Sequence, residues 1–181
     1  RPARKAYFDG RLADLRARIG NALVGEALAK KYDAGKLAVL HERGKLVEFL
    51  KAQGDEPLLG GWIARMAPYA GAKVVADHTL WPYFARRFGL VVAGYMEPRP
   101  GVPPSTKHLR ELVGTMRDLK VKAILASPYY DLKHAEFLAQ NTGARIANMA
   151  HQTGSRKGAD TYIETVDHNV RELAAALGGG R

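Results

Sequence analysis

The chain contains no cysteine, no long apolar run and none of the common nucleotide or hydrolase motifs. Without cysteine there is no disulfide framework, no thiolate zinc site and no cysteine nucleophile, although the cellular compartment stays open. No apolar run approaches the roughly 18–20 residues of a membrane span. The sequence does not begin with Met, and no charged-then-apolar leader opens it. GxGxxG, P-loop, Gly-x-Ser-x-Gly and HExxH patterns are absent too, so function must be sought in less standard arrangements.

What the chain does contain is an ordinary globular composition with a basic excess. Its 181 residues are 46% hydrophobic and 25% charged, enough for one large domain or two small ones with a buried core. The formal net charge is +10, from 28 Lys+Arg and 18 Asp+Glu. The basic doublets are scattered and are not interleaved with an aromatic platform. We therefore expect a solvated basic surface and no nucleic-acid partner.

Residues 1–70 have a helical texture. Phe8, Leu12, Leu15 and Ile19 recur at helical spacing, which predicts a long helix over residues 1–20 that Gly20 weakens or ends. Short helical patterns punctuated by glycine follow over residues 21–70.

From residue 71 onward, short apolar strands alternate with helices. Strands are predicted at 73–76, 90–93, 121–126 and 144–149. The helices between and after them include one capped by Ser105 or Thr106, one from about Asp131 to Gln140, and a last one from Asp160 that stops at Gly178. This alternation predicts an α/β fold with a four-stranded, mainly parallel sheet flanked by helices.

Polar side chains follow the strands at the edge where such sheets bind ligands. Asp77 and His78 come after the first strand, the segment 127–131 with its two tyrosines after the third, and His151 after the fourth. Histidine is a common zinc ligand, so His78 and His151 are candidate metal ligands. Two other interpretations stay open: a histidine here can be a cap or a hydrogen-bonded core residue, and Asp77, His78 and His151 can serve a small α/β enzyme. Asp77 can also be an outer-shell residue or a helix cap.

The remaining histidines give weaker signals. They lie in helical segments among polar residues, and we expect all four on the solvated surface: His41, His108, His134 and His168.

One segment resembles a known family. From Ala72 to Leu90 a strand ends in His78, an aromatic helix follows with a Tyr83-Phe84 pair, and Gly89-Leu90 closes the segment. This run is similar to the metal-binding solute-binding proteins of zinc and manganese ABC transporters. Residues 97–112, 143–146 and 160–177 resemble the family's loop and helix, last strand and closing helix, the latter with Asn169 and Leu173 in matching places. The resemblance covers about residues 70–178, and loosely 1–20.

The resemblance implies two α/β lobes joined by a rigid helix, with one divalent metal ion between them. His78 matches the third ligand of that family. The fourth is usually an Asp after the last strand, but residues 149–155 contain no carboxylate, and His151 stands at this position when one gap is allowed. A nitrogen ligand there favours Zn²⁺ over the alternative, Mn²⁺.

By the same resemblance, residues 1–20 are the linking helix, 21–70 a helical segment without a clear counterpart, and 71–181 the carboxy-terminal lobe. The amino-terminal lobe, with two further histidine ligands, is not recognisable in the sequence. We therefore expect a piece of a longer, non-catalytic receptor, periplasmic or lipid-anchored, that delivers the ion to the membrane permease of an ABC transporter. With only half of the ligands, the chain should hold the metal weakly.

Overall fold

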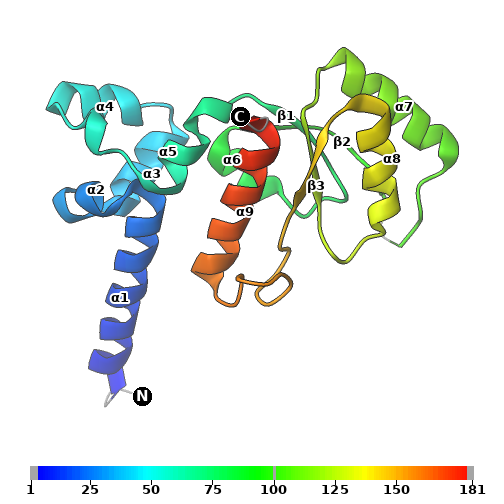
Figure 1. The fold of residues 1–181 in the computed structure, drawn as a ribbon. Coiled ribbons are helices and arrows are strands. Elements are labelled where there is room, and N and C mark those ends of the chain that lie inside the picture. The colour runs from blue at the N-terminus through cyan, green and yellow to red at the C-terminus, as the bar shows by residue number, and fades with distance from the viewer. Residues whose placement is uncertain (1–3, 100, 179–181) are drawn as a thin grey trace. The chain divides into compact units, whose positions relative to one another are not determined.

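The computed structural model describes residues 4–99 and 101–178. These residues form two compact units, and the division between them falls between Arg65 and Met66. The first unit is helical and the second is α/β, so the predicted fold class is confirmed (Figure 1). Among the described residues, none of the helices combines the length and apolar character that crossing a bilayer requires.

The helical unit is built from one long helix and several short ones: α1 (Lys5–Val24), α2 (Glu26–Lys31), α3 (Ala34–Glu42), α4 (Leu46–Gln53), a 3₁₀ turn (Glu56–Leu58) and most of α5 (Gly61–Met66). Apolar residues of these elements form one core cluster: Val24, Leu28, Leu37, Leu46, Leu50 and Ile63.

The sequence predicts that Gly20 weakens or ends the first helix, and it does not end it. α1 continues to Val24 before Gly25 follows with a positive φ of 87°. A Cβ added at Gly20 would lie 2.7 Å from the Cβ of Ala34 in α3. Glycine is therefore placed here for the close approach of two helices, because the packing against α3 outweighs its low helix propensity.

A buried carboxylate holds the helical unit together. Asp55 accepts a hydrogen bond from the Lys31 ammonium at 2.8 Å and another from the Tyr32 hydroxyl. These two hydrogen bonds, that of Lys31 first, hold the pKa of Asp55 below its usual range. The charged group thus fixes the end of α2 to the loop after α4.

The α/β unit contains a fully parallel sheet in the order β2-β1-β3-β4. The strands are β1 (Lys73–Ala76), β2 (Val91–Tyr95), β3 (Ala123–Ala126) and β4 (Arg145–Asn148). They lie within one or two residues of the predicted ones. The helices are α6 (Pro82–Phe88), α7 (Thr106–Asp118), α8 (Leu132–Thr142) and α9 (Tyr162–Gly178), with a 3₁₀ turn (Ala67–Tyr69) before β1.

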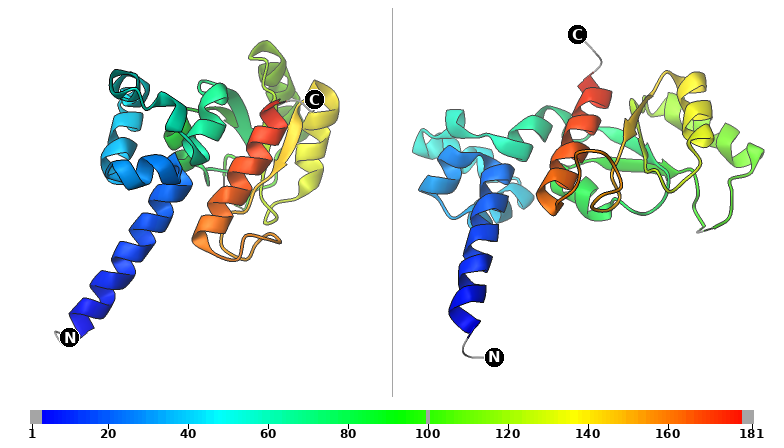
Figure 2. Two further views of the ribbon diagram at one scale, coloured as in Figure 1. Left: turned by 60° about the vertical axis from the view of Figure 1, so that its left-hand side comes forward. Right: turned by 60° about the horizontal axis from the view of Figure 1, so that its bottom comes forward.

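Helices cover both faces of this sheet. In the views of Figures 1 and 2, α6 and α9 lie on one face and α7 and α8 on the other. Val75 and Ile124 belong to the core cluster shared with α7 and α8, as the alternation of side chains along a strand requires. The strand order reverses direction between β1 and β3, so the crevice beyond their carboxyl ends is the position where such sheets bind ligands.

Candidate metal-binding site

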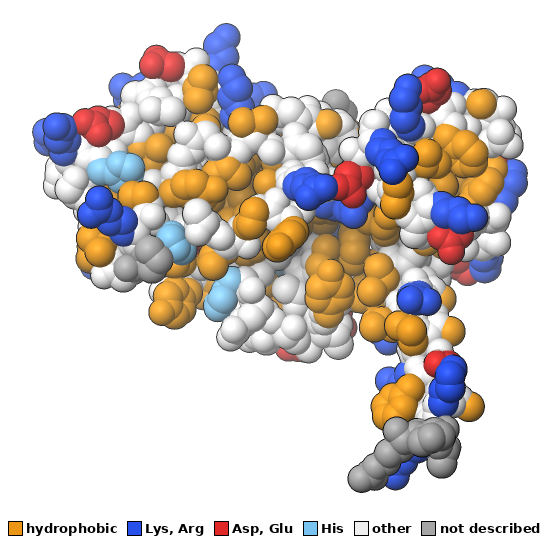
Figure 3. Space-filling view, turned by 180° about the vertical axis from the view of Figure 1, so that it is seen from behind, with side chains coloured by type: hydrophobic (Ala, Val, Ile, Leu, Met, Phe, Trp, Pro, Cys, Tyr) orange, Lys and Arg blue, Asp and Glu red, His pale blue; other side chains and the backbone are white. Residues whose placement is uncertain are grey.

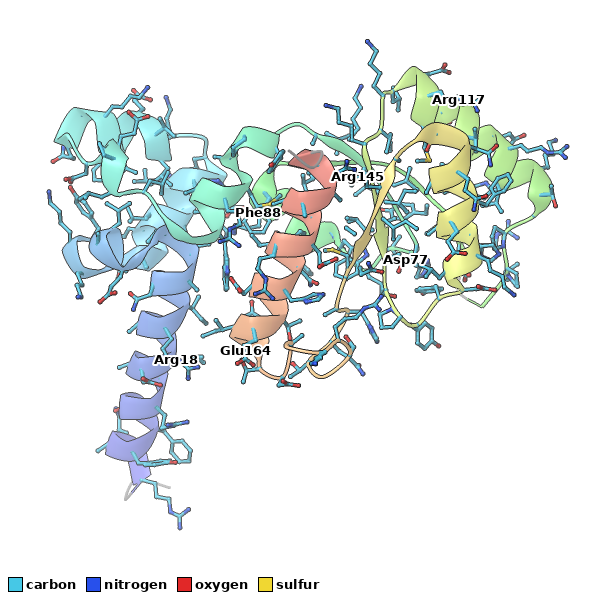
Figure 4. The ribbon with its side chains drawn as sticks, in the orientation of Figure 1. Arg18, Asp77, Phe88, Arg117, Arg145 and Glu164 are labelled. Atoms are coloured by element: carbon cyan, nitrogen blue, oxygen red, sulfur yellow. The ribbon has the colours of Figure 1, made fainter. Side chains whose placement is uncertain are left out.

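Asp77 ties the two central loops together at the carboxyl end of the sheet. The residue is 1% exposed. Oδ1 accepts hydrogen bonds from the His78 backbone N–H at 2.8 Å and from Trp81 Nε1–H at 3.1 Å, and Oδ2 accepts one from the Ser127 backbone N–H at 2.6 Å. Figure 4 shows Asp77 within the unit beside this end of the sheet. With both oxygens occupied by N–H donors, Asp77 orients the loops and is not placed to act as a general base.

His78 is held in one orientation by the backbone. The residue is 9% exposed, and its Nδ1 lies 2.6 Å from the carbonyl oxygen of Glu97. A carbonyl only accepts, so Nδ1 carries a proton, and in the neutral imidazole the lone pair is then on Nε2, with the Thr79 hydroxyl 3.5 Å away. The Glu97 N–H in turn donates to the Asp77 carbonyl at 2.8 Å, which fixes the acceptor itself. An imidazole whose second nitrogen donates to a carbonyl is the arrangement found for histidines that bind metals.

Two tyrosines lie between His78 and His151. The His78 and Tyr130 ring centroids are 5.9 Å apart, those of Tyr130 and Tyr129 5.1 Å, and those of Tyr129 and His151 6.0 Å. Burial first, and then the nearby carboxylates of Asp77 and Glu97, raise the pKa of Tyr130 above its usual value. Tyr130 is therefore a neutral phenol at neutral pH.

His151 follows β4 on a loop that α9 holds in place. The side-chain amide of Asn169 pairs with both backbone groups of Ala150: Oδ1 accepts from its N–H at 2.6 Å, and Nδ2 donates to its carbonyl at 2.9 Å. Asn169 is 4% exposed. In the sequence Asn169 stands out only through its place in the closing helix. A polar residue on the buried face of a helix is the signal that points to such a role.

Within the described residues, Nδ1 of His151 is buried and has no hydrogen-bond partner. An orphaned ring nitrogen of this kind costs free energy unless a ligand or a turn of the ring satisfies it. The structure thus brings both predicted ligands to one edge of the sheet, separated by the tyrosine pair. No group of three or more His, Asp or Glu side chains suited to a metal ion occurs in the described part of the chain.

His134 is half-buried and lies beside the site, with its Nδ1 3.9 Å from a carboxylate oxygen of Glu97, the residue whose carbonyl holds His78. His108 and His168 do not join the pair. His108 Nε2 lies 2.8 Å from the Tyr95 carbonyl, and His168 Nε2 lies 2.8 Å from the Asn148 carbonyl. Both rings are half-buried, so the expectation of plain solvated histidines is wrong for them. Their role is to join helices to the ends of strands. Figure 3 shows histidine side chains among apolar ones on the surface seen from behind.

Comparison with known proteins identifies the family. The pattern of the zinc-uptake complex component A, periplasmic (ZnuA), matches residues 59–176. The chain belongs to the ZnuA family. This confirms the resemblance drawn from the sequence, and the family consists of transport binding proteins and not of enzymes. The high-affinity zinc uptake system protein ZnuA of Haemophilus influenzae is 27% identical over 99 residues, which are 48% of this chain and 29% of that protein.

Solved structures share the fold at lower identity. The laminin-binding protein Lmb of Streptococcus agalactiae, described as a bifunctional protein with adhesin and metal transporting activity, is 23% identical with a TM-score of 0.52, covering 84% of this chain and 52% of that one. The Ni²⁺ complex of FpvC from Pseudomonas aeruginosa is 21% identical with a TM-score of 0.53, and the match covers 91% of this chain and 58% of that one. A Zn(II)-bound mutant variant of AdcAII from Streptococcus pneumoniae is 24% identical with a TM-score of 0.52, and the match covers 84% of this chain and 47% of that one. The chain therefore spans about half the length of these solved relatives, and less of the ZnuA protein.

Proposed function

We propose that this chain is the metal-receiving part of a ZnuA-type binding protein that captures a divalent cation and delivers it to the membrane permease of an ABC transporter. The ligands in this proposal are His78 and His151. The observation that carries it is the hydrogen bond from His78 Nδ1–H to the Glu97 carbonyl, because in the neutral imidazole it places the lone pair on Nε2 and fixes the orientation of the ring. A metal ion would replace only the long 3.5 Å contact of Nε2 with the Thr79 hydroxyl.

The donor chemistry supports Zn²⁺ as the cargo. Two imidazoles are borderline-soft nitrogen donors that suit Zn²⁺ better than Mn²⁺, which prefers oxygen. The relatives themselves are recorded with different ions: AdcAII with Zn(II), and FpvC with Mn²⁺ and with Ni²⁺. The ligand set of each chain must therefore decide its ion, and here that set is nitrogen. Two ligands leave at least two coordination positions to water or to another part of the protein, so affinity should be weak.

The exposed face of α1 supports a two-lobe arrangement. In this proposal residues 1–20 link two lobes, and residues 71–181 form the carboxy-terminal lobe. A second lobe supplies the other ligands. The whole protein is periplasmic or lipid-anchored outside the cytoplasmic membrane. α1 carries large apolar side chains that are exposed in this structure, which an isolated helix would not retain in water without cost: Tyr7, Phe8, Leu12 and Leu15.

The test is metal titration of single-histidine variants. Calorimetry with Zn²⁺ and with Mn²⁺ should show weak, micromolar or poorer binding of Zn²⁺ to the chain and still weaker binding of Mn²⁺. His78→Ala and His151→Ala should each lower Zn²⁺ affinity by about tenfold or more. His168→Ala is the matched control, since its ring is also held by a carbonyl in the same unit, and it should leave affinity unchanged.

Long-range ¹H–¹⁵N spectra of the imidazoles give a second readout. Zn²⁺ should shift Nε2 of His78, while Nδ1 stays protonated. Zinc affinity that His78→Ala leaves unchanged would contradict the site, and submicromolar affinity of the chain alone would contradict the two-ligand arrangement.

A further inference from the structure

The amino end of the sheet carries a hollow that the metal site does not use. Its lining includes the residues before and at the start of β1, the loop between α7 and β3, and the end of α9, among them Tyr69, Lys73, Lys120, Lys122 and Leu177. All of them belong to the α/β unit. Parallel strands begin at this edge and end at the edge of Asp77. Figure 4 shows Arg145, the first residue of β4, toward the opposite end of the sheet from Asp77.

The hollow is basic, and no acidic side chain among the described residues that line it balances its charges. Three lysines, Lys73, Lys120 and Lys122, line it together with no acidic side chain. None of the three makes a side-chain hydrogen bond or ion pair with the described residues. Lysines elsewhere are mixed: Lys5, Lys30 and Lys45 each pair with an acid three or four residues away, whereas Lys133 and Lys157 stand singly without an ion pair to the described residues. What distinguishes the three lysines of the hollow is that they line one concavity together. Like charges gathered in one concavity repel each other unless an anion joins them.

The backbone at Lys120 is an independent sign. It has a φ of 54° and is the one non-glycine residue with positive φ in the described part of the chain. It follows the end of α7, where the Val121 N–H donates to the Met116 carbonyl at 2.9 Å. Helices α4, α6 and α8 use glycine at the corresponding left-handed position: Gly54, Gly89 and Gly143. A lysine here is less stable than a glycine, and strained residues of this kind cluster at binding sites.

We propose that this hollow binds a phosphate-bearing anion with two or more negative charges. Lysine ammoniums act as point charges that suit the tetrahedral oxyanion of a phosphate, whereas planar carboxylates are matched better by the arginine fork. The Tyr69 hydroxyl adds a neutral hydrogen-bond donor, and it lies at the wall near Gly178, where an added Cβ would be 2.8 Å from its oxygen. Free oligophosphates and the headgroups of anionic phospholipids share this chemistry.

Binding is tested on the full chain in metal-free buffer at about 150 mM salt, where exposed charges are screened and a flat basic surface binds poorly. One arm titrates tripolyphosphate in a calorimeter, and the other measures co-flotation with vesicles containing phosphatidylglycerol. We expect saturable binding in at least one arm, and the arm that responds identifies the source of the phosphate. No saturable binding in either arm overturns the proposal.

Two double variants of equal charge separate a site from general basicity. Lys73→Gln/Lys122→Gln should lose about tenfold to thirtyfold in affinity, since each lysine near an anionic surface contributes roughly one factor of five. Lys133→Gln/Lys157→Gln removes the same charge from exposed positions outside the hollow and should change affinity by less than about twofold. Equal losses in the two variants would overturn the proposal, because only net charge would then matter.

Lys120→Gly distinguishes a binding role from a structural one. Glycine relieves the left-handed backbone, so the melting temperature should rise, by about 2–4 °C, while affinity for the phosphate probe falls. A variant that is more stable and binds equally well would remove Lys120 from the site. A Lys120→Gly variant with a lower melting temperature would mean that Lys120 stabilises the fold, which would contradict a binding role.

Discussion

The two ends of the parallel sheet use polar residues in opposite ways. At the carboxyl end, Asp77, His78 and Asn169 are buried, and their polar atoms are joined to backbone groups of neighbouring loops. At the amino end, Lys73, Lys120 and Lys122 are exposed and make no ion pairs with described residues.

This difference teaches how one sheet can present two kinds of surface. Buried, fully bonded groups fix the position of a side chain such as His78, and a metal ion requires that precision. Exposed cations attract at longer range and need little preorganisation, which suits a multivalent anion. Substitutions of the buried, bonded groups Asp77 and Asn169 should therefore cost mainly stability, and those of the amino-end lysines mainly anion binding.

The largest effect is expected for Asp77→Ala. The change removes the acceptor of three N–H groups, those of His78, Trp81 and Ser127, in a buried place. Urea unfolding should show a loss of about 3–5 kcal/mol. Asp77→Asn keeps one acceptor oxygen and should lose less. A loss below 1 kcal/mol for the alanine variant would mean that water replaces the carboxylate, and the contrast between the two ends would fail.

Asn169→Ala should have the next largest effect. It leaves the N–H and carbonyl of Ala150 without partners and opens a small space under the loop of His151. The expected cost is about 2–3 kcal/mol in free energy of unfolding. Because the loop positions His151, Zn²⁺ affinity should fall as well. Asn148→Ala is the control, because Asn148 is the last residue of β4 and is exposed. It should leave the free energy of unfolding and the Zn²⁺ affinity nearly unchanged.

Gly143→Ala measures what a side chain costs at the left-handed position that Lys120 occupies after α7. Gly143 follows α8 with a φ of 74°, and a Cβ added to it would have no neighbouring atom within 4 Å, so the backbone conformation is the obstacle to a side chain. We expect a loss of about 1 kcal/mol, measured by thermal unfolding. If Gly143→Ala does not lower the free energy of unfolding, a side chain at the left-handed position costs little in this protein. The positive φ of Lys120 would then be no evidence for a binding site.

The smallest effect is expected for Ser127→Ala. The backbone N–H of Ser127 serves Asp77, but its buried hydroxyl has no partner among the described residues. Removing the hydroxyl should change stability by less than about 0.5 kcal/mol, or increase it slightly. A clear destabilisation would reveal a bond of this hydroxyl to water or to a bound ion, and would add Ser127 to the functional end of the sheet.

Much of the fold was predictable because its signals are local. Apolar runs of four to six residues between helical patterns located all four strands to within one or two residues, and the alternation predicted parallel pairing. The continuation of the first helix past Gly20 has a tertiary cause, since the approach of Ala34 from another helix is invisible in the pattern around it.

The candidate site was predictable only in part. His78 and His151 stood out because both directly follow strands, and parallel strands end at one edge. The hydrogen-bond partner of His78 could not be predicted, because Glu97 acts through its backbone carbonyl, which any residue would supply. Nor did the sequence indicate that His108 and His168 lie at hydrogen-bond distance from backbone carbonyls.

The sequence by itself determined the order of elements, the edge at which polar residues gather and the family to which the chain belongs, because these depend on periodicity and on neighbouring residues. Only the tertiary structure decided which groups meet. It placed the Asp77 carboxylate on a backbone N–H 50 residues away, and it gathered lysines from separate segments into one hollow while the composition showed only a scattered charge of +10. Hydrogen bonds and charge clusters depend on distances in space, and only the folded chain fixes those.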